Sequence, residues 1–136
     1  MAKRMLRPIF IAWVWAVMVA MLALSVYSEA EGVKKRVRFA RGETSAAIEG
    51  SVIRGERDTY LLGARAGQSM TVRVTSLEEN AVFQIYEPGG KKALKGAGET
   101  DDATNWSGEL PVSGDYRIVV GPTRGNASYK LEVNIK

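Results

Sequence analysis

The chain has neither cysteine nor histidine among its 136 residues, and these two absences exclude several classes of function. Without cysteine there is no disulfide and no thiol nucleophile, and without both residues the usual zinc ligands are missing. The most common general base is missing as well. The sequence also has no Gly-x-Ser-x-Gly elbow and no phosphate-binding loop. It therefore predicts a protein that is not an enzyme and needs no metal or cofactor.

Long apolar runs are also scarce, and the one that exists, residues 9–24, lies near the N-terminus. Basic residues precede this run and a small-residue stretch follows it, an order typical of a secretory signal peptide. We expect residues 1–30 to be the signal peptide, with cleavage after Ser28 or Ala30, and the protein to be exported. The run of 16 residues is shorter than the roughly 20 needed to span a bilayer. An uncleaved membrane anchor is the alternative.

Positive charge is modest outside the export signal. The whole chain has 19 basic and 15 acidic residues, a formal net charge of +4. Removing residues 1–30 leaves 16 basic and 14 acidic residues, a net charge of about +2. This small charge removes the main argument for nucleic-acid binding.

The rest of the chain lacks the 3.6-residue periodicity of an amphipathic helix, and alternation with a period of two dominates instead. Residues 31–36 are polar and predict a flexible leader before a domain of residues 37–136. Eight short strand-like segments separated by turns predict an all-β fold, a single antiparallel, jelly-roll-like β-sandwich. Gly50 interrupts the second segment and predicts a bulge or bend. The predicted strands begin at residues 37–39 and continue with 46–53, 58–62, 69–74, 81–86, 106–110, 115–120 and 128–135.

Several short motifs follow one another along this predicted sandwich. They are FARGETSA (39–46), DTY (58–60), AGQ (66–68), EPG (87–89), WSGELP (106–111) and SGDY (113–116). In this order they resemble the bacterial pre-peptidase C-terminal-like β-sandwich group, and within it the periplasmic inhibitors of g-type lysozyme. The resemblance covers residues 37–136. Most of these motifs are shared by the whole group and therefore indicate the fold more than the activity.

The resemblance implies a periplasmic inhibitor whose protein partner is a g-type lysozyme and which blocks the glycan cleft by inserting loops. The exported single-domain format and the pair Thr123 and Arg124 favour this branch. One position departs from the inhibitor pattern: Val119 stands where the inhibitors carry a second arginine inside the strand, and Arg117 lies two residues earlier.

The candidate partner-binding residues are Ser113, Gly114, Tyr116, Thr123 and Arg124. The first three also have a structural interpretation, because Ser and Gly suit a tight turn and a buried tyrosine can bond its hydroxyl locally, as in a tyrosine corner. Arg124 is different. It lies in a loop of residues 121–126 that contains proline and flanking glycines, and such a loop suits presentation of a guanidinium to a carboxylate of the lysozyme.

The alternative function is an envelope glycan- or peptidoglycan-binding module of the same group, without inhibitory activity. In that interpretation Trp106 is a sugar-stacking platform, whereas in the structural one it caps the core. The acidic residues 99–102 lack the spacing of a calcium loop, so a solvated loop is the better interpretation. The oligomeric state is not predicted.

Overall fold

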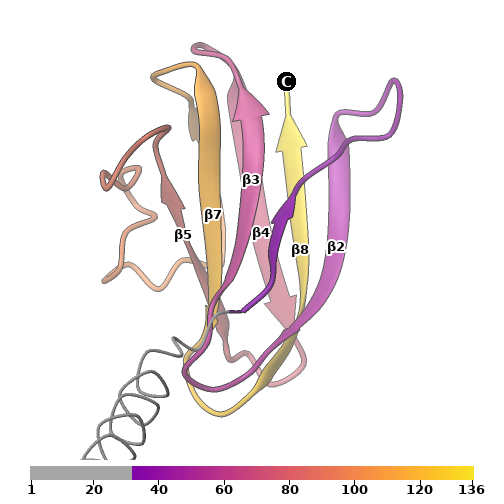
Figure 1. Cartoon of the computed structure of the whole chain (residues 1–136), viewed down its shortest axis with the longest axis vertical. Helices are drawn as coiled ribbons and strands as arrows, with labels where there is room; N and C mark the ends of the chain where they lie inside the picture. Colours follow the sequence, from indigo (N-terminus) through magenta and orange to yellow (C-terminus); the bar gives the residue numbers. More distant parts are fainter. Residues whose placement is uncertain (1–31) are drawn as a thin grey trace, which may run out of the picture. The chain divides into compact units, whose positions relative to one another are not determined.

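Alternation of buried and exposed side chains defines the strands of the computed structural model, which describes residues 32–136. Eight strands in this range form two four-stranded sheets, with the orders β1-β3-β7-β5 and β2-β8-β4-β6 (Figure 1). All pairings are antiparallel except that of β1 with β3. The predicted all-β sandwich is thus confirmed. The strands are β1 (Lys34–Arg36), β2 (Ser45–Val52), β3 (Asp58–Ala64), β4 (Ser69–Ser76), β5 (Ala81–Tyr86), β6 (Asn105–Glu109), β7 (Gly114–Pro122) and β8 (Ala127–Ile135).

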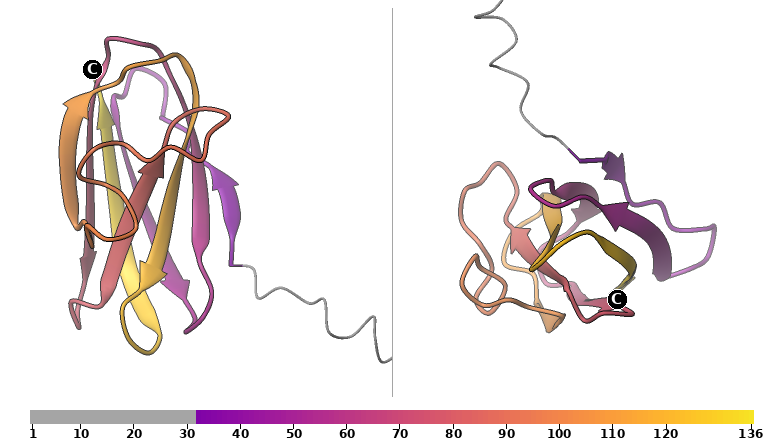
Figure 2. Two further views of the ribbon diagram at one scale, coloured as in Figure 1. Left: turned by 90° about the vertical axis from the view of Figure 1, so that its left-hand side faces the viewer. Right: turned by 90° about the horizontal axis from the view of Figure 1, so that it is seen from below.

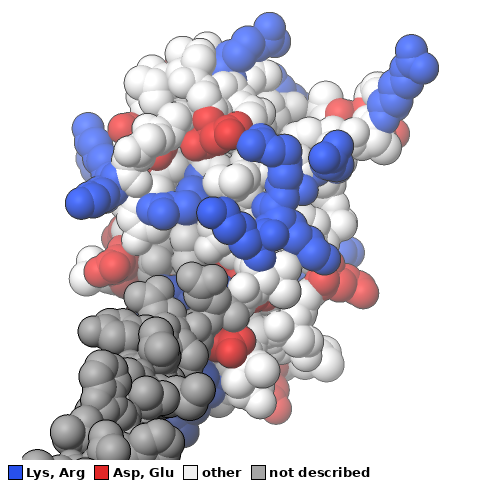
Figure 3. All heavy atoms as spheres, in the orientation of Figure 1, with Lys and Arg blue, Asp and Glu red and all other residues white. Residues whose placement is uncertain are grey.

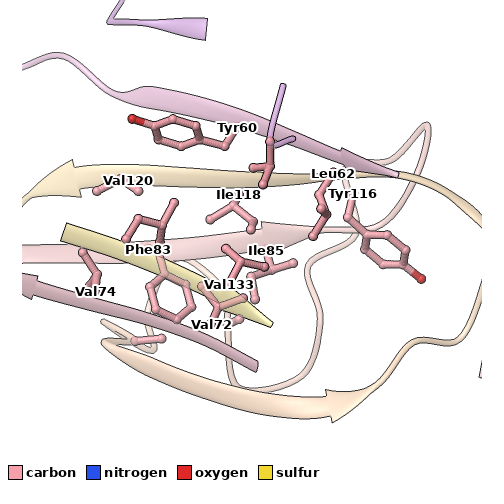
Figure 4. Packing of buried hydrophobic residues seen from close by; sticks show 14 of the residues in the cluster. Tyr60, Leu62, Val72, Val74, Phe83, Ile85, Tyr116, Ile118, Val120 and Val133 are labelled. Atoms are coloured by element: carbon pink, nitrogen blue, oxygen red, sulfur yellow. The ribbon is translucent and has the colours of Figure 1, made fainter. Parts of the chain in front are cut away.

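The inner faces of the two sheets enclose one hydrophobic core (Figures 2 and 4). Phe83 and Ile118 from one sheet face Val72 and Val133 from the other, and each is at most 1% exposed. Burial of each such side chain stabilises the fold by about 1.5–3 kcal/mol relative to leaving it in water. The core runs between the sheets, so polar side chains and turns are left to form the outer faces and the two ends.

The first strand lies before the predicted one. It is formed by Lys34–Arg36, and residues 37–39, predicted as a strand, follow it outside any strand. Lys34–Arg36 pair with β3, so the second half of the segment predicted as a flexible leader belongs to the sheet. The physical reason lies in Asp58, whose Oδ1 accepts a hydrogen bond of 2.8 Å from the Val33 amide. Thr59 in turn donates its amide to the Val33 carbonyl. A strand made of charged residues is held by these distant partners, which local periodicity does not reveal.

Gly50 does not form the predicted bulge. It pairs with Tyr129 in a β2–β8 ladder that runs without an offset from Ser45 to Val52. The glycine is needed for a different reason, since a Cβ at this position would lie 2.5 Å from the Tyr129 hydroxyl oxygen. Close approach of a neighbouring group is the other common reason for glycine inside a strand.

Tyr129 is kept in place by a buried polar network. Its hydroxyl donates to Asp58 Oδ2 at 2.6 Å and lies 2.5 Å from the hydroxyl of Tyr60. Burial raises the pKa of both tyrosines above the usual 10.0, and the hydrogen bond to Asp58 adds to this effect for Tyr129. The network connects both sheets with the chain segment that enters β1.

Residues 32–136 contain no helix long and apolar enough to cross a membrane. The predicted signal peptide and its two cleavage sites lie outside the described residues.

Candidate functional site

Strand β7 separates the predicted site residues into two groups. Ser113 and Gly114 lie at its start, and Thr123 and Arg124 follow its last residue, Pro122. The nine residues of β7 span about 26 Å at the usual rise of a strand. The structure therefore does not bring Ser113 and Arg124 together: they lie at opposite ends of the sandwich (Figure 1).

The residues at the start of β7 make their contacts within the domain. Tyr116 is fully buried, and its hydroxyl donates to the Val112 carbonyl at 2.6 Å, which is the geometry of a tyrosine corner. Ser113 Oγ accepts the Ala66 amide at 2.8 Å. Gly114 has a φ of 141°, and a Cβ there would lie 2.7 Å from Pro88. These contacts match the structural interpretation of the motif.

The loop after β7 is shorter than predicted. Gly121 and Pro122 belong to the strand and pair with Val82 and Ala81, so neither residue hinges or braces the loop. The loop consists of residues 123–126. Its positive φ of 56° at Gly125 is the only left-handed backbone within it, and the turn therefore depends on one glycine.

Asn80, from the turn after β4, fixes this loop instead. The residue is 2% exposed, and its Nδ2 donates to the carbonyls of Arg124 and Asn126 at 3.0 Å each. Its own carbonyl accepts the Thr123 amide at 2.8 Å. Three hydrogen bonds to one buried side chain and its backbone thus hold the loop in a single shape. A preformed loop loses less conformational entropy when it docks.

The Arg124 side chain is exposed but not free to turn in all directions. Its Nη2 donates to the Glu78 carbonyl at 2.6 Å. A guanidinium has five N–H donors, so most of its donors stay available to an external acceptor.

A second arginine lies beside Arg124. Arg54 and Arg124 line the same shallow hollow of about 320 Å³, together with Gly55 and residues 122, 123 and 125. The Arg54 amide donates to Asn126 Oδ1 at 2.9 Å, which ties the two turns together. Arg54 is not among the residues predicted from the sequence. The available signal was its Arg-Gly dipeptide in a turn, which repeats the Arg-Gly of residues 124 and 125.

Three turns meet at this end of the sandwich, residues 53–56, 77–80 and 123–126, and we refer to them as the loop end. Besides the two arginines, the loop end carries two of the most exposed large apolar side chains of the described chain. Ile53 is 55% exposed and Leu77 is 100% exposed. Exposed apolar groups next to arginine are typical of protein-binding surfaces.

The other candidate residues lie elsewhere. Trp106 is partly buried against the core, and its Nε1 donates to the Lys95 carbonyl at 2.9 Å. This arrangement matches the capping role. Asp101 Oδ2 accepts the Gly98 amide at 2.7 Å and so closes a local turn. In residues 32–136 no three acidic side chains gather in a way that suits a metal ion.

Val119 and Arg117 both lie on the outer face of β7, because Tyr116 and Ile118 point into the core. The departure from the inhibitor pattern therefore leaves an aliphatic side chain, 9% exposed, in the outer surface of the sheet.

Known proteins of similar sequence and structure exist, although no family model matches the chain. An Escherichia coli (strain K12) protein named "Inhibitor of g-type lysozyme" is 30% identical over 122 residues, which cover 83% of this chain and 89% of that protein. The crystal structure of Aeromonas hydrophila PliG, a periplasmic lysozyme inhibitor of g-type lysozyme, matches with a TM-score of 0.67 and 33% identity. The match covers 79% of this chain and 100% of the PliG chain. The pre-peptidase C-terminal domain of a Bacillus anthracis collagenase shares the fold. Its TM-score is 0.52 at 14% identity, and the match covers 76% of this chain and 94% of that domain.

Proposed function

Because the chain belongs to the family of periplasmic inhibitors of g-type lysozyme, we propose that it inhibits a g-type lysozyme in the periplasm. The similarity to the Escherichia coli inhibitor carries this proposal, since it extends over nearly the whole of that protein. The match to the Aeromonas hydrophila inhibitor supports it independently at the level of the fold. These relatives agree with the resemblance that the sequence motifs predicted. They are inhibitors and not enzymes, as expected for this chain.

We further propose that the loop end is the surface that enters the glycan cleft. Glycosidases place paired Asp or Glu side chains in that cleft. Arg124 and Arg54 both line one hollow, and two arginines suit a carboxylate better than one would. Ile53 and Leu77 supply apolar area beside the charges. The loop of residues 123–126 is held in one shape by Asn80, which lowers the entropic cost of docking.

The sequence motifs predict contact of Ser113, Gly114 and Tyr116 with the lysozyme, a prediction that is not tested, and their contacts in the domain support another role. Their hydrogen bonds and packing hold the opposite end of the sandwich. We propose that they act on inhibition only through the stability of the domain.

Lysis of cell-wall substrate by a g-type lysozyme, measured with increasing inhibitor, tests the function. We expect wild-type protein to stop lysis near equimolar amounts, and Arg124→Ala to need at least tenfold more protein, since loss of a charge-assisted contact costs about 1.5–3 kcal/mol. Arg65→Ala is the matched control, because Arg65 is an exposed turn arginine at the opposite end of β3.

The outcomes separate the two parts of the proposal. Undisturbed lysis in excess wild-type protein contradicts the inhibitory function itself. Inhibition that is equally strong in Arg124→Ala and Arg65→Ala contradicts only the assignment of the loop end.

A further inference from the structure

The outer face of the β1-β3-β7-β5 sheet is strongly basic. The strand registers place Arg36, Leu61, Arg117 and Tyr86 in one row across this face. Lys34 lies in the next row, and a belt of Lys and Arg side chains crosses the middle of the molecule in this view (Figure 3). We refer to this surface as the basic face and define it by Lys34, Arg36, Arg57 and Arg117.

The outer face of the β2-β8-β4-β6 sheet has no excess of positive charge. Outward positions on β2, β8, β4 and β6 carry two basic and three acidic side chains, mixed with serine, threonine and asparagine. The charged residues are Arg73, Lys130, Glu49, Glu109 and Glu132. On the basic face the strands offer one carboxylate only, Asp115. The positive charge of the domain is therefore concentrated on one of its two broad surfaces.

Three guanidiniums of the basic face are held in place. Arg36 forms two hydrogen bonds with Asp115, at 2.9 and 2.7 Å. Arg117 stacks over the Tyr86 ring, with 4.7 Å from its Cζ to the ring centroid, and donates to the Gly90 carbonyl. Arg57 donates to Gln84 Oε1 at 3.3 Å.

The basic face keeps an excess of positive charge after these contacts are counted. Within residues 32–136 Asp115 is the one carboxylate that forms an ion pair with it. Lys34, Arg57 and Arg117 form no ion pair with the carboxylates of the described residues, so their charges are not compensated there. Fixed guanidiniums spread over a sheet match an extended array of phosphate groups better than a single small anion.

We propose that the basic face binds the surface of an anionic phospholipid membrane. A protein partner would call for an apolar centre, as protein interfaces have. The large apolar side chains that are most exposed in residues 32–136 all lie outside the strands of this sheet. Attraction to anionic headgroups needs only surface cations. The loop end lies at the end of the strands and the basic face along their side, so membrane contact leaves the turns accessible (Figure 1).

Sedimentation with lipid vesicles tests this proposal on protein recovered from the periplasm of an expressing bacterium. Vesicles of phosphatidylglycerol and phosphatidylcholine in equal amounts are compared with pure phosphatidylcholine. We expect binding to the anionic vesicles only, and weaker binding at higher salt because exposed charges are screened. Lys34→Gln combined with Arg117→Gln should weaken binding by about fivefold per removed charge.

Arg73→Gln combined with Lys130→Gln is the matched control, because it removes the same charge from outward strand positions of the other sheet. Lys34→Gln combined with Arg57→Gln is a second test that leaves the stacked Arg117 intact. We expect the control to bind like wild type and both basic-face variants to retain lysozyme inhibition.

Three results would overturn the proposal. The first is no preference of the wild-type protein for anionic vesicles, and the second is that the control variant weakens vesicle binding as much as the basic-face variants do. The third is that the basic-face variants lose lysozyme inhibition while the wild-type protein does not bind vesicles. The last result would assign the face to a protein interface.

Discussion

At the scale of single residues, the hydroxyl groups of Tyr60 and Tyr129 give the fold a specific sensitivity to alkaline pH. Both lie in the core with Asp58, and burial raises the pKa of each above 10.0. In the unfolded chain they ionise near pH 10. The native state holds them neutral, so the stabilising contribution is complete below pH 10 and is lost as the pH rises further.

We therefore predict that the free energy of unfolding falls above pH 10, by up to about 1.4 kcal/mol per pH unit from Tyr129, with Tyr60 acting in the same direction. Tyr129→Phe should have a shallower slope, because one of the two groups no longer titrates. Urea unfolding at several pH values from neutral to strongly alkaline measures the slope in both proteins. Titration of the lysines is common to both and cancels in the comparison. Equal slopes would show that Tyr129 is not linked to unfolding in this way.

Single residues of the candidate site were the features least predictable from the sequence. Arg124 stood out because of its turn, but the partner in its hollow, Arg54, is far away along the chain. Asn80, which holds the loop, reads in the sequence as an ordinary turn residue. Contacts between turns depend on which strands become neighbours, and this information is absent from any local window.

At the scale of elements, the alternation of apolar and polar residues was sufficient for most strands. β5 was predicted with its observed bounds, and β4 and β8 differ by one or two residues at an end. β1 was missed, because an edge strand of lysine and arginine has no apolar face to detect. In the same way Gly50 was noticed but assigned the wrong cause, since the side chain above it belongs to β8.

The close packing of β8 on β2 predicts the effect of a small substitution. Gly50→Ala places a Cβ against Tyr129, whose hydroxyl cannot move without leaving Asp58. We expect a loss of about 1–3 kcal/mol in stability, the usual range for overpacking a core. Gly63→Ala is the control, because its Cβ would meet nothing closer than 3.4 Å, and it should stay within about 0.5 kcal/mol of wild type. Urea denaturation measures both, and equal stability of the two variants would contradict the steric explanation.

At the scale of the whole molecule, the sandwich separates two surfaces that the sequence mixes. The basic residues of the loop end and of the basic face alternate along the chain, as Arg54 and Arg57 do only three residues apart. Net charge alone, near neutrality for the domain, gave no hint of this separation. The strand order places some of the basic residues at the loop end and others on the basic face.

This separation leads to a prediction about simultaneous binding. The loop end can enter a lysozyme while the basic face lies on a membrane, because neither contact covers the other (Figures 1 and 3). Anionic vesicles should therefore leave the inhibition curve unchanged within about twofold. Lysis of cell-wall substrate, followed with and without phosphatidylglycerol vesicles at low salt, measures this. The double variant Lys34→Gln, Arg117→Gln controls for direct effects of the lipid on the lysozyme. If vesicles abolish inhibition by the wild type but not by this variant, the two surfaces overlap. The lysozyme contact would then extend from the loop end onto the β1-β3-β7-β5 sheet.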